Sequence, residues 1–280
     1  MSLPITVLIL TKNEESAISE CIASIQDFEQ ILIIDSKSSD RTREIAQSYG
    51  AQVVEFIWDG NYPKKKQWAL ERSEISNNWV LFLDADERVS PELSSELLTL
   101  FEKGEPLDFG AFEIPLQYYF LGKGLNHGHK VRKIALVDRT KCFFSPVNDL
   151  HVTNMWEVEG HYQPMFKFSL GKLSNRIMHQ DPDPLFDYFA RHNRYSDWEA
   201  ELRVNPEMRE SVRNMRTKQG KIFEKLPAKP FFFFLYSYFI RSGWRDGKIG
   251  FNYAVALSFY YWQISIKTLE KRINAQSQEF

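Results

Sequence analysis

Short apolar runs alternate with amphipathic stretches over the first hundred residues of the chain. The run from Ile5 to Leu10 is continuous, as is usual for a strand buried on both faces of a parallel sheet. The predicted strands cover residues 5–10, 31–34, 52–57 and 79–83, and the predicted helices cover residues 15–25, 40–49 and 64–73, with a further helix beginning at Pro91. Repeated strand–helix–strand units with short connections predict an α/β fold with a mostly parallel, Rossmann-like sheet.

Polar residues directly follow three of these predicted strands. The stretch Thr11 to Glu14 follows the first strand, Asp35 follows the second, and Asp84 to Asp86 follow the fourth. In open α/β sheets, ligands bind at the carboxyl ends of the strands. The sequence therefore predicts one binding site where these three polar clusters converge.

Asp84 and Asp86 are separated by Ala85 and lie just past a buried strand. Hard carboxylate oxygens on a loop suit Mg²⁺ or Mn²⁺, which keep open positions for a diphosphate. Such a metal would neutralise charge on a leaving diphosphate. The alternative is that the pair only caps the following helix, which an isolated Asp-x-Asp often does.

The pattern is looser in the second half of the chain. Two further strands are predicted, on either side of a loop rich in glycine and histidine that contains His127 and His129. The predicted elements are strands 109–116 and 133–137, a helix over residues 182–200, a basic connector over residues 218–230, and two helices within residues 231–272 that meet around residues 243–250.

Composition and charge indicate a folded protein with two unlike parts. The chain is 43% hydrophobic and 26% charged, with a net charge of −2. From Arg209 onward, however, Lys and Arg outnumber Asp and Glu by 13 to 5, and aromatic residues crowd the same stretch. This C-terminal part is expected to meet an anionic surface. Cys21 and Cys142 have neither disulfide nor metal-ligand spacing, and the N-terminus shows no signal peptide, so a cytoplasmic location is expected.

The order of four blocks resembles the nucleotide-sugar-binding half of the family 2 glycosyltransferases. The blocks are Thr11 to Glu15, Asp35 to Thr42, Lys64 to Lys66, and Leu83 to Arg88. The resemblance implies the GT-A fold, a nucleoside-diphosphate-sugar donor (UDP-sugar above all) and a Mn²⁺ or Mg²⁺ ion. Carried over by position, it implies a nucleotide-sugar site of Thr11, Asn13, Glu14, Asp35, Lys66, Asp84 and Ala85, with Asp86 and Asp84 as metal ligands.

Two of these blocks have plainer readings. The lysines 64–66 could be an ordinary solvated helix start, although an anion would relieve their repulsion with the helix dipole. Asp35 could be a turn residue. His179 matches a histidine that could approach the metal or the diphosphate, and the alternative is a surface histidine.

The segment 156–164 resembles a Val-His-Glu-x-Pro motif of lipopolysaccharide-core-type members of that family. His161 and Pro164 match the motif, but Tyr162 stands where the glutamate would be. An inverting transfer needs a carboxylate to deprotonate the acceptor hydroxyl. Glu159, two residues before His161 and on the same strand face, is the first candidate for that base, and Glu157 is the second.

The C-terminal part resembles the same members through residues 241–251. Phe231 to Ile240 is too short to span a bilayer of about 30 Å. Aromatic and basic residues together favour a helix that lies at a membrane surface. The alternative is a helical hairpin packed on the catalytic domain or on a second subunit, so an oligomer is possible. The predicted domains are residues 1–217 (a nucleotide-sugar half 1–104 and an acceptor half 105–217) and residues 218–280.

The sequence thus predicts an inverting, metal-dependent glycosyltransferase at the inner face of the cell membrane. Its acceptor would be a glycolipid or an oligosaccharide of the lipopolysaccharide or exopolysaccharide type, and no nucleic acid partner is expected. A sugar-1-phosphate nucleotidyltransferase is the second enzymatic reading, although residues 11–15 lack the glycines of its phosphate loop. A degenerate membrane-associated scaffold is the non-enzymatic one.

Overall fold

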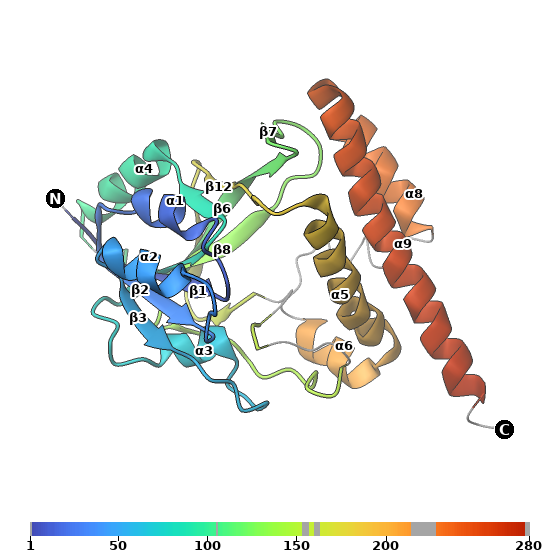
Figure 1. The fold of residues 1–280 in the computed structure, drawn as a ribbon, viewed down its shortest axis with the longest axis horizontal. Helices are drawn as coiled ribbons and strands as arrows, with labels where there is room; N and C mark the ends of the chain where they lie inside the picture. Colours follow the sequence, from blue (N-terminus) through green and yellow to red (C-terminus); the bar gives the residue numbers. More distant parts are fainter. Residues whose placement is uncertain (1, 105, 153–156, 160–162, 214–227, 278–280) are drawn as a thin grey trace. The chain divides into compact units, whose positions relative to one another are not determined.

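The computed structural model describes residues 2–104, 106–152, 157–159, 163–213 and 228–277. The chain divides into two compact units (Figure 1). The sheet unit comprises residues 1–124, 130–145 and 157–182, and the helical unit comprises residues 125–129, 146–156 and 183–280. The chain therefore passes between the units several times. The domain boundary predicted at residue 217 stays a prediction.

The sheet unit is built on a parallel four-strand core. Its order is β3 (Gln52–Glu55), β2 (Phe28–Asp35), β1 (Leu3–Thr11) and β4 (Trp79–Asp84). The sheet continues with β8 (Arg132–Asp138), antiparallel to β4, then β6 (Phe109–Phe120), β12 (Ile177–His179) and β5 (Glu87–Val89). Strands β7 (Lys123–Gly124) and β11 (Ser169–Lys172) pair with β6, while β9 (Cys142–Phe143) and β10 (Met165–Phe166) form a separate ribbon. The predicted α/β fold with a mostly parallel sheet is confirmed.

Strand register aligns the ends of the three central strands. Thr11 lies opposite Asp35, and Leu10 lies opposite both Ile34 and Asp84. The carboxyl ends of β1, β2 and β4 therefore meet at one edge, as their apolar runs and polar endings predicted.

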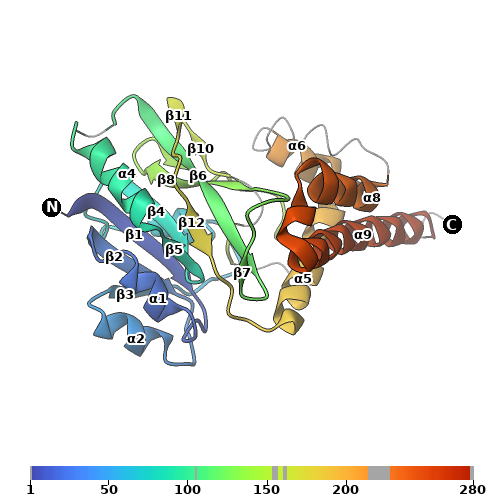
Figure 2. The same ribbon diagram turned by 90° about the horizontal axis from the view of Figure 1, so that it is seen from above.

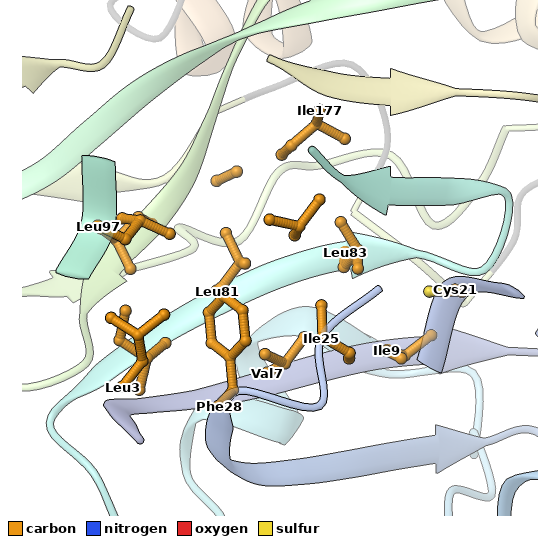
Figure 3. Close-up of a cluster of buried hydrophobic side chains, with 14 of the residues drawn as sticks. Leu3, Val7, Ile9, Cys21, Ile25, Phe28, Leu81, Leu83, Leu97 and Ile177 are labelled. Atoms are coloured by element: carbon orange, nitrogen blue, oxygen red, sulfur yellow. The ribbon is translucent and has the colours of Figure 1, made fainter. Parts of the chain in front are cut away.

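Helices α1 (Ile18–Ala23), α2 (Thr42–Ser48), α3 (Lys65–Leu70) and α4 (Pro91–Phe101) follow β1, β2, β3 and β5. Helix α4 begins at Pro91 as predicted, and the Ser90 hydroxyl caps it by accepting from the Leu93 amide at 3.2 Å. Side chains of β1, β4, α4 and β12 gather into one apolar cluster (Figure 3). Val7 and Leu81 are fully buried in it, as expected for strands covered on both faces.

The helical unit contains α5 (Leu185–Val204), α6 (Pro206–Arg213), α8 (Lys229–Phe234), a π-helix (Leu235–Ile240), a 3₁₀ turn (Gly243–Asp246) and α9 (Gly247–Ser277). Helix α5 runs alongside α9 (Figure 2), and Lys267 on α9 forms an ion pair with Asp197 on α5 at 2.6 Å. Helix α8 also packs against α9, and the 3₁₀ turn lies between them, so the two helices predicted to meet around residues 243–250 are present as a hairpin. None of the described helices is both long enough and apolar enough to cross a membrane.

Candidate active site

The loops after β1 and β2 are joined by hydrogen bonds. The Thr11 hydroxyl donates to Asp35 Oδ2 at 2.9 Å, because the register places the two residues opposite each other. The Asn13 side-chain oxygen accepts from the Ser39 amide at 2.8 Å, and the Glu14 amide donates to the Thr42 hydroxyl at 2.7 Å. Four of the predicted nucleotide-site residues thus belong to one connected pair of loops.

Asp35 is fully buried at the end of β2. Besides the Thr11 hydroxyl, its carboxylate accepts from the amide of Ser38 at 2.9 Å and from the Ser38 hydroxyl at 2.5 Å. Both of its oxygens therefore already have protein donors. Contact between Asp35 and a nucleotide base stays a prediction, and Oδ1, which accepts the hydrogen bond of the Ser38 amide, is the oxygen with acceptor capacity left.

Asp84 ends β4 and shares a cation with Glu87. The Lys133 ammonium donates to Asp84 Oδ2 at 2.8 Å and to Glu87 Oε2 at 2.6 Å. Glu87 Oε2 also accepts from the Asp84 backbone amide at 2.9 Å. Burial opposes ionisation of Asp84, but the charges of Lys133 and Lys66 outweigh it and lower the pKa of Asp84 to about 2. Asp84 is therefore an anion at neutral pH, and 48% of its side chain remains exposed.

Asp86 lies beside His179, the last residue of β12. Its Oδ2 is 3.5 Å from His179 Nε2, and its carbonyl accepts from the Gln180 amide at 2.8 Å. Burial raises the pKa of Asp86, which the nearby His179 opposes. His179 Nδ1 is buried without a hydrogen-bond partner, 4.0 Å from Glu87 Oε1. The three predicted metal ligands thus come from two segments about ninety residues apart and lie around one another.

The side chains of Asp84 and Asp86 suit a divalent cation whose remaining ligands come from a substrate. Among the described residues, no group of three or more His, Cys, Asp or Glu side chains has the geometry of a preformed metal site. The protein would supply mainly the carboxylate oxygens of Asp84 and Asp86. Mg²⁺ and Mn²⁺ favour such hard donors, and Mg²⁺ is usually held by one or two carboxylates together with substrate phosphates.

A pocket of about 230 Å³ opens next to this cluster. Its polar lining includes Lys66 and Lys133, and its apolar lining includes Phe82 and Phe144. Pro164, which matches the family motif, also lines it. Because Lys133 contacts Asp84 directly, the pocket adjoins the acidic triplet. Arg132 is a third cation of the lining, and three cations with apolar walls suit an anionic ligand that has a less polar part.

Glu159 has a local role that sequence reasoning missed. Its carboxylate accepts from the backbone amides of Lys66 at 2.6 Å and Gln67 at 2.9 Å, at the start of α3. Burial raises the pKa of Glu159, and these amide hydrogen bonds and Lys66 counteract that effect. The anion expected at this lysine-rich helix start is therefore present within the chain itself.

Glu157 lies at the same helix start with a different environment. Its carboxylate forms an ion pair with Lys65 at 3.5 Å, and 17% of its side chain is exposed, whereas Glu159 is 1% exposed. Burial lowers the pKa of Lys65 to about 8. His161 and Tyr162 lie outside the described residues.

Ala85 contributes no polar group to this cluster, and the two histidines of the glycine-rich loop belong to the other unit. Ala85 is buried in the apolar core, so its side chain fills space behind the two aspartates. His127 and His129 belong to the helical unit, where His127 Nδ1 lies 2.9 Å from Asp246 Oδ1. Lys133 and Glu87 were not predicted, since only the pairing of β8 with β4 brings Lys133 beside Asp84.

The chain is similar to known glycosyltransferases. The model of glycosyl transferase family 2 matches residues 6–170, more than half of the chain. An uncharacterized glycosyltransferase of Rickettsia typhi is 28% identical over 91% of this chain and 83% of its own. The lipopolysaccharide core biosynthesis glycosyltransferase LpsC of Rhizobium meliloti is 27% identical over 96% of this chain and 93% of its own. Among solved structures, TarS of S. aureus is 14% identical, with a TM-score of 0.44 over 98% of this chain and 83% of that one.

The fold and the family match define a glycosyltransferase of the α/β class. The chain belongs to glycosyl transferase family 2, and its sheet unit has the GT-A fold that the sequence predicted.

Proposed function

We propose that this protein moves a sugar, with inversion, from a nucleoside-diphosphate donor such as a UDP-sugar to a glycolipid or oligosaccharide acceptor of the lipopolysaccharide or exopolysaccharide type. The observation that carries the proposal is the contact of Asp84, at the carboxyl end of β4 and two residues before Asp86, with Lys133, which lines one pocket together with Lys66. This is an arrangement suited to a metal-bound diphosphate. The similarity to LpsC, a protein of lipopolysaccharide core synthesis, supports this acceptor class.

The donor would lie across the ends of β1, β2 and β4. The nucleoside would meet the joined loops that carry Thr11, Asn13, Glu14 and Asp35. The diphosphate would reach Asp84 and Asp86, with the Lys66 ammonium on the pocket side. A bound Mn²⁺ or Mg²⁺ would supply Lewis-acid stabilisation of the departing diphosphate. His179, beside Asp86, would orient that carboxylate or join the ligand set.

For the catalytic base, we propose Glu157 ahead of Glu159. A base needs an oxygen that an acceptor hydroxyl can reach. Both oxygens of Glu159 accept backbone amides and its side chain is buried, whereas Glu157 is partly exposed and held by one lysine. Replacement of Glu157 by Gln should remove turnover and leave UDP binding intact. Normal turnover in this variant would exclude it, and loss of turnover only in Glu159→Gln, with normal stability, would restore the first candidate.

The reaction class is tested by incubating the purified protein with Mn²⁺ and a panel of nucleotide sugars and measuring the release of nucleoside diphosphate. We expect slow hydrolysis of one or a few donors that requires the metal, since water can replace an acceptor. Release of pyrophosphate from sugar phosphate and nucleoside triphosphate would instead indicate a nucleotidyltransferase. Release of neither product, together with no nucleotide binding, would indicate a degenerate scaffold.

The tip of the C-terminal hairpin is proposed to rest on an anionic lipid surface. Exposed apolar side chains lie there with exposed cations: Phe239, Ile240 and Trp244 are 55–73% exposed, and Arg241, Arg245 and Lys248 are exposed beside them. Asp246, the one acidic residue between positions 228 and 252, is turned toward His127. The exposed charge of this tip is therefore basic, as binding to anionic headgroups requires. The enzyme would then work peripherally at the cytoplasmic face.

A further inference from the structure

Lys133 occupies a position between two carboxylates that a metal ion would otherwise be drawn to. Its ammonium lies 2.8 Å from Asp84 Oδ2 and 2.6 Å from Glu87 Oε2, and its side chain is only 15% exposed. Charge-assisted hydrogen bonds of this length are among the stronger polar contacts in proteins. One oxygen of the proposed metal ligand Asp84 is thus already bound to a cation of the protein itself.

The antiparallel pairing of β4 with β8 places Lys133 beside Asp84. Leu81 pairs with Leu136 and Val80 with Val137 across β4 and β8, so the same antiparallel register leads Lys133 toward Asp84. Glu87, which is 1% exposed, holds the ammonium from the other side and also accepts the Asp84 amide. Lys133 is therefore fixed by backbone pairing and by a buried counter-charge.

Lys133 also lines the pocket that adjoins the triplet. A small change of side-chain torsion would take its ammonium off Asp84 and toward a ligand in that pocket, while Glu87 could keep its hydrogen bond. The lysine can thus exchange one anionic partner, Asp84, for another, the diphosphate of a bound nucleotide.

We propose that Lys133 is a resident cation that competes with the divalent metal for Asp84 until the nucleotide arrives. In the free enzyme, it neutralises Asp84 and keeps the metal affinity low. On binding of a metal–diphosphate complex, the Lys133 ammonium would turn to the diphosphate and leave Asp84 free to hold the metal. Lys133 is thus a positioning residue that couples metal binding to donor binding. The inference rests on the proposed metal–diphosphate function.

The test is the affinity for Mn²⁺ in the absence of nucleotide, measured by the electron paramagnetic resonance signal of free Mn²⁺. Lys133→Met should bind Mn²⁺ at least about tenfold more tightly than the wild type, because the competing cation is gone. Lys133→Arg, which keeps the charge, should stay close to the wild type. A lysine with a merely structural role would leave Mn²⁺ affinity unchanged or weaken it.

A double variant, Lys133→Met with Glu87→Gln, separates the effect of competition on Mn²⁺ affinity from the effect of net charge. It also leaves no unpaired buried carboxylate at position 87. It carries the same net charge as the wild type but has no cation on Asp84. We expect it also to bind Mn²⁺ more tightly without nucleotide. Affinity equal to or below that of the wild type in this folded double variant would overturn the proposal.

The same samples separate this inference from the proposed function. Wild-type protein that binds no UDP with Mn²⁺ present would refute the metal–diphosphate site itself. Wild-type protein that binds UDP with Mn²⁺, combined with unchanged nucleotide-free Mn²⁺ affinity in Lys133→Met and in the double variant, would refute only the competition.

Discussion

Glu159 contacts Lys66 twice: its carboxylate accepts the Lys66 backbone amide at 2.6 Å, and its carbonyl accepts the Lys66 ammonium at 3.2 Å. One residue thus fixes both the first turn of α3 and the direction of a lysine that lines the pocket. A residue ninety-three positions away in the chain therefore determines how this part of the proposed diphosphate site is held.

Glu159→Ala should lower the stability of the protein. It removes the acceptor from two amides at a helix start, and loss of a helix cap typically costs about 0.5–2 kcal/mol. Chemical denaturation monitored by circular dichroism measures the difference. Glu71→Ala, at the exposed C-terminal end of the same helix, is the control and should change stability by less than about 0.5 kcal/mol. Equal stability of Glu159→Ala and the wild type would show that the cap contributes nothing.

Thr11→Val should destabilise the joined loops. The substitution keeps the shape but removes the hydroxyl that donates to buried Asp35, and a buried carboxylate that loses a donor costs about 1–3 kcal/mol. The exposed Thr99→Val provides a matched control on α4. If the two substitutions have the same effect on unfolding free energy, the Thr11–Asp35 contact does not stabilise the protein.

Much of this site could be predicted from the sequence, because strand ends follow from pattern alone. The apolar runs before Thr11, Asp35 and Asp84 placed each residue at the end of a parallel strand, and parallel strands bring such ends to one edge. Lys133 could not be predicted in the same way. Its partner is set by an antiparallel register with β4, and a shift of one residue would have turned it to the other face of the sheet.

In the second half of the chain too, local elements could be predicted from the sequence, but contacts between distant residues could not. The helix predicted over residues 182–200 is present as α5, from Leu185 to Val204, because its signals are local. The capping role of Glu159 depends on contacts between residues 66–67 and 159, which no local pattern encodes. The contact of His127 with Asp246, 119 positions away, is likewise invisible to any local pattern.

Acid should reveal the ion pair of Asp84. Its pKa in the folded protein is lowered to about 2, below the value of about 3.9 expected for an unfolded chain. The stabilisation is therefore complete above about pH 4 and is lost as the pH falls toward 2. Unfolding free energies of the wild type and of Asp84→Asn, measured from pH 6 to pH 2.5, should converge at the acid end. A constant difference between the two proteins over this range would contradict the ion pair.

The hairpin tip is tested with vesicles. A triple substitution of Phe239, Ile240 and Trp244 by Ser should weaken binding to anionic vesicles about tenfold or more, since membrane binding scales with buried apolar area. A matched triple substitution of Ile57, Leu107 and Leu121 by Ser, exposed apolar residues of the sheet unit, should leave binding unchanged. Flotation of the two variants with the vesicles measures this difference. Equal flotation would mean that the tip is not the lipid contact.

The most direct measurement of the central claim is calorimetric titration of UDP into the wild type and into Asp86→Asn, each with and without Mn²⁺. We predict UDP binding to the wild type that is strengthened by Mn²⁺, and loss of that strengthening in Asp86→Asn, while the thermal unfolding of the variant stays close to that of the wild type. UDP binding that is the same with and without Mn²⁺, or an Asp86→Asn variant that keeps the full effect of the metal, would contradict a metal–diphosphate site at Asp84 and Asp86.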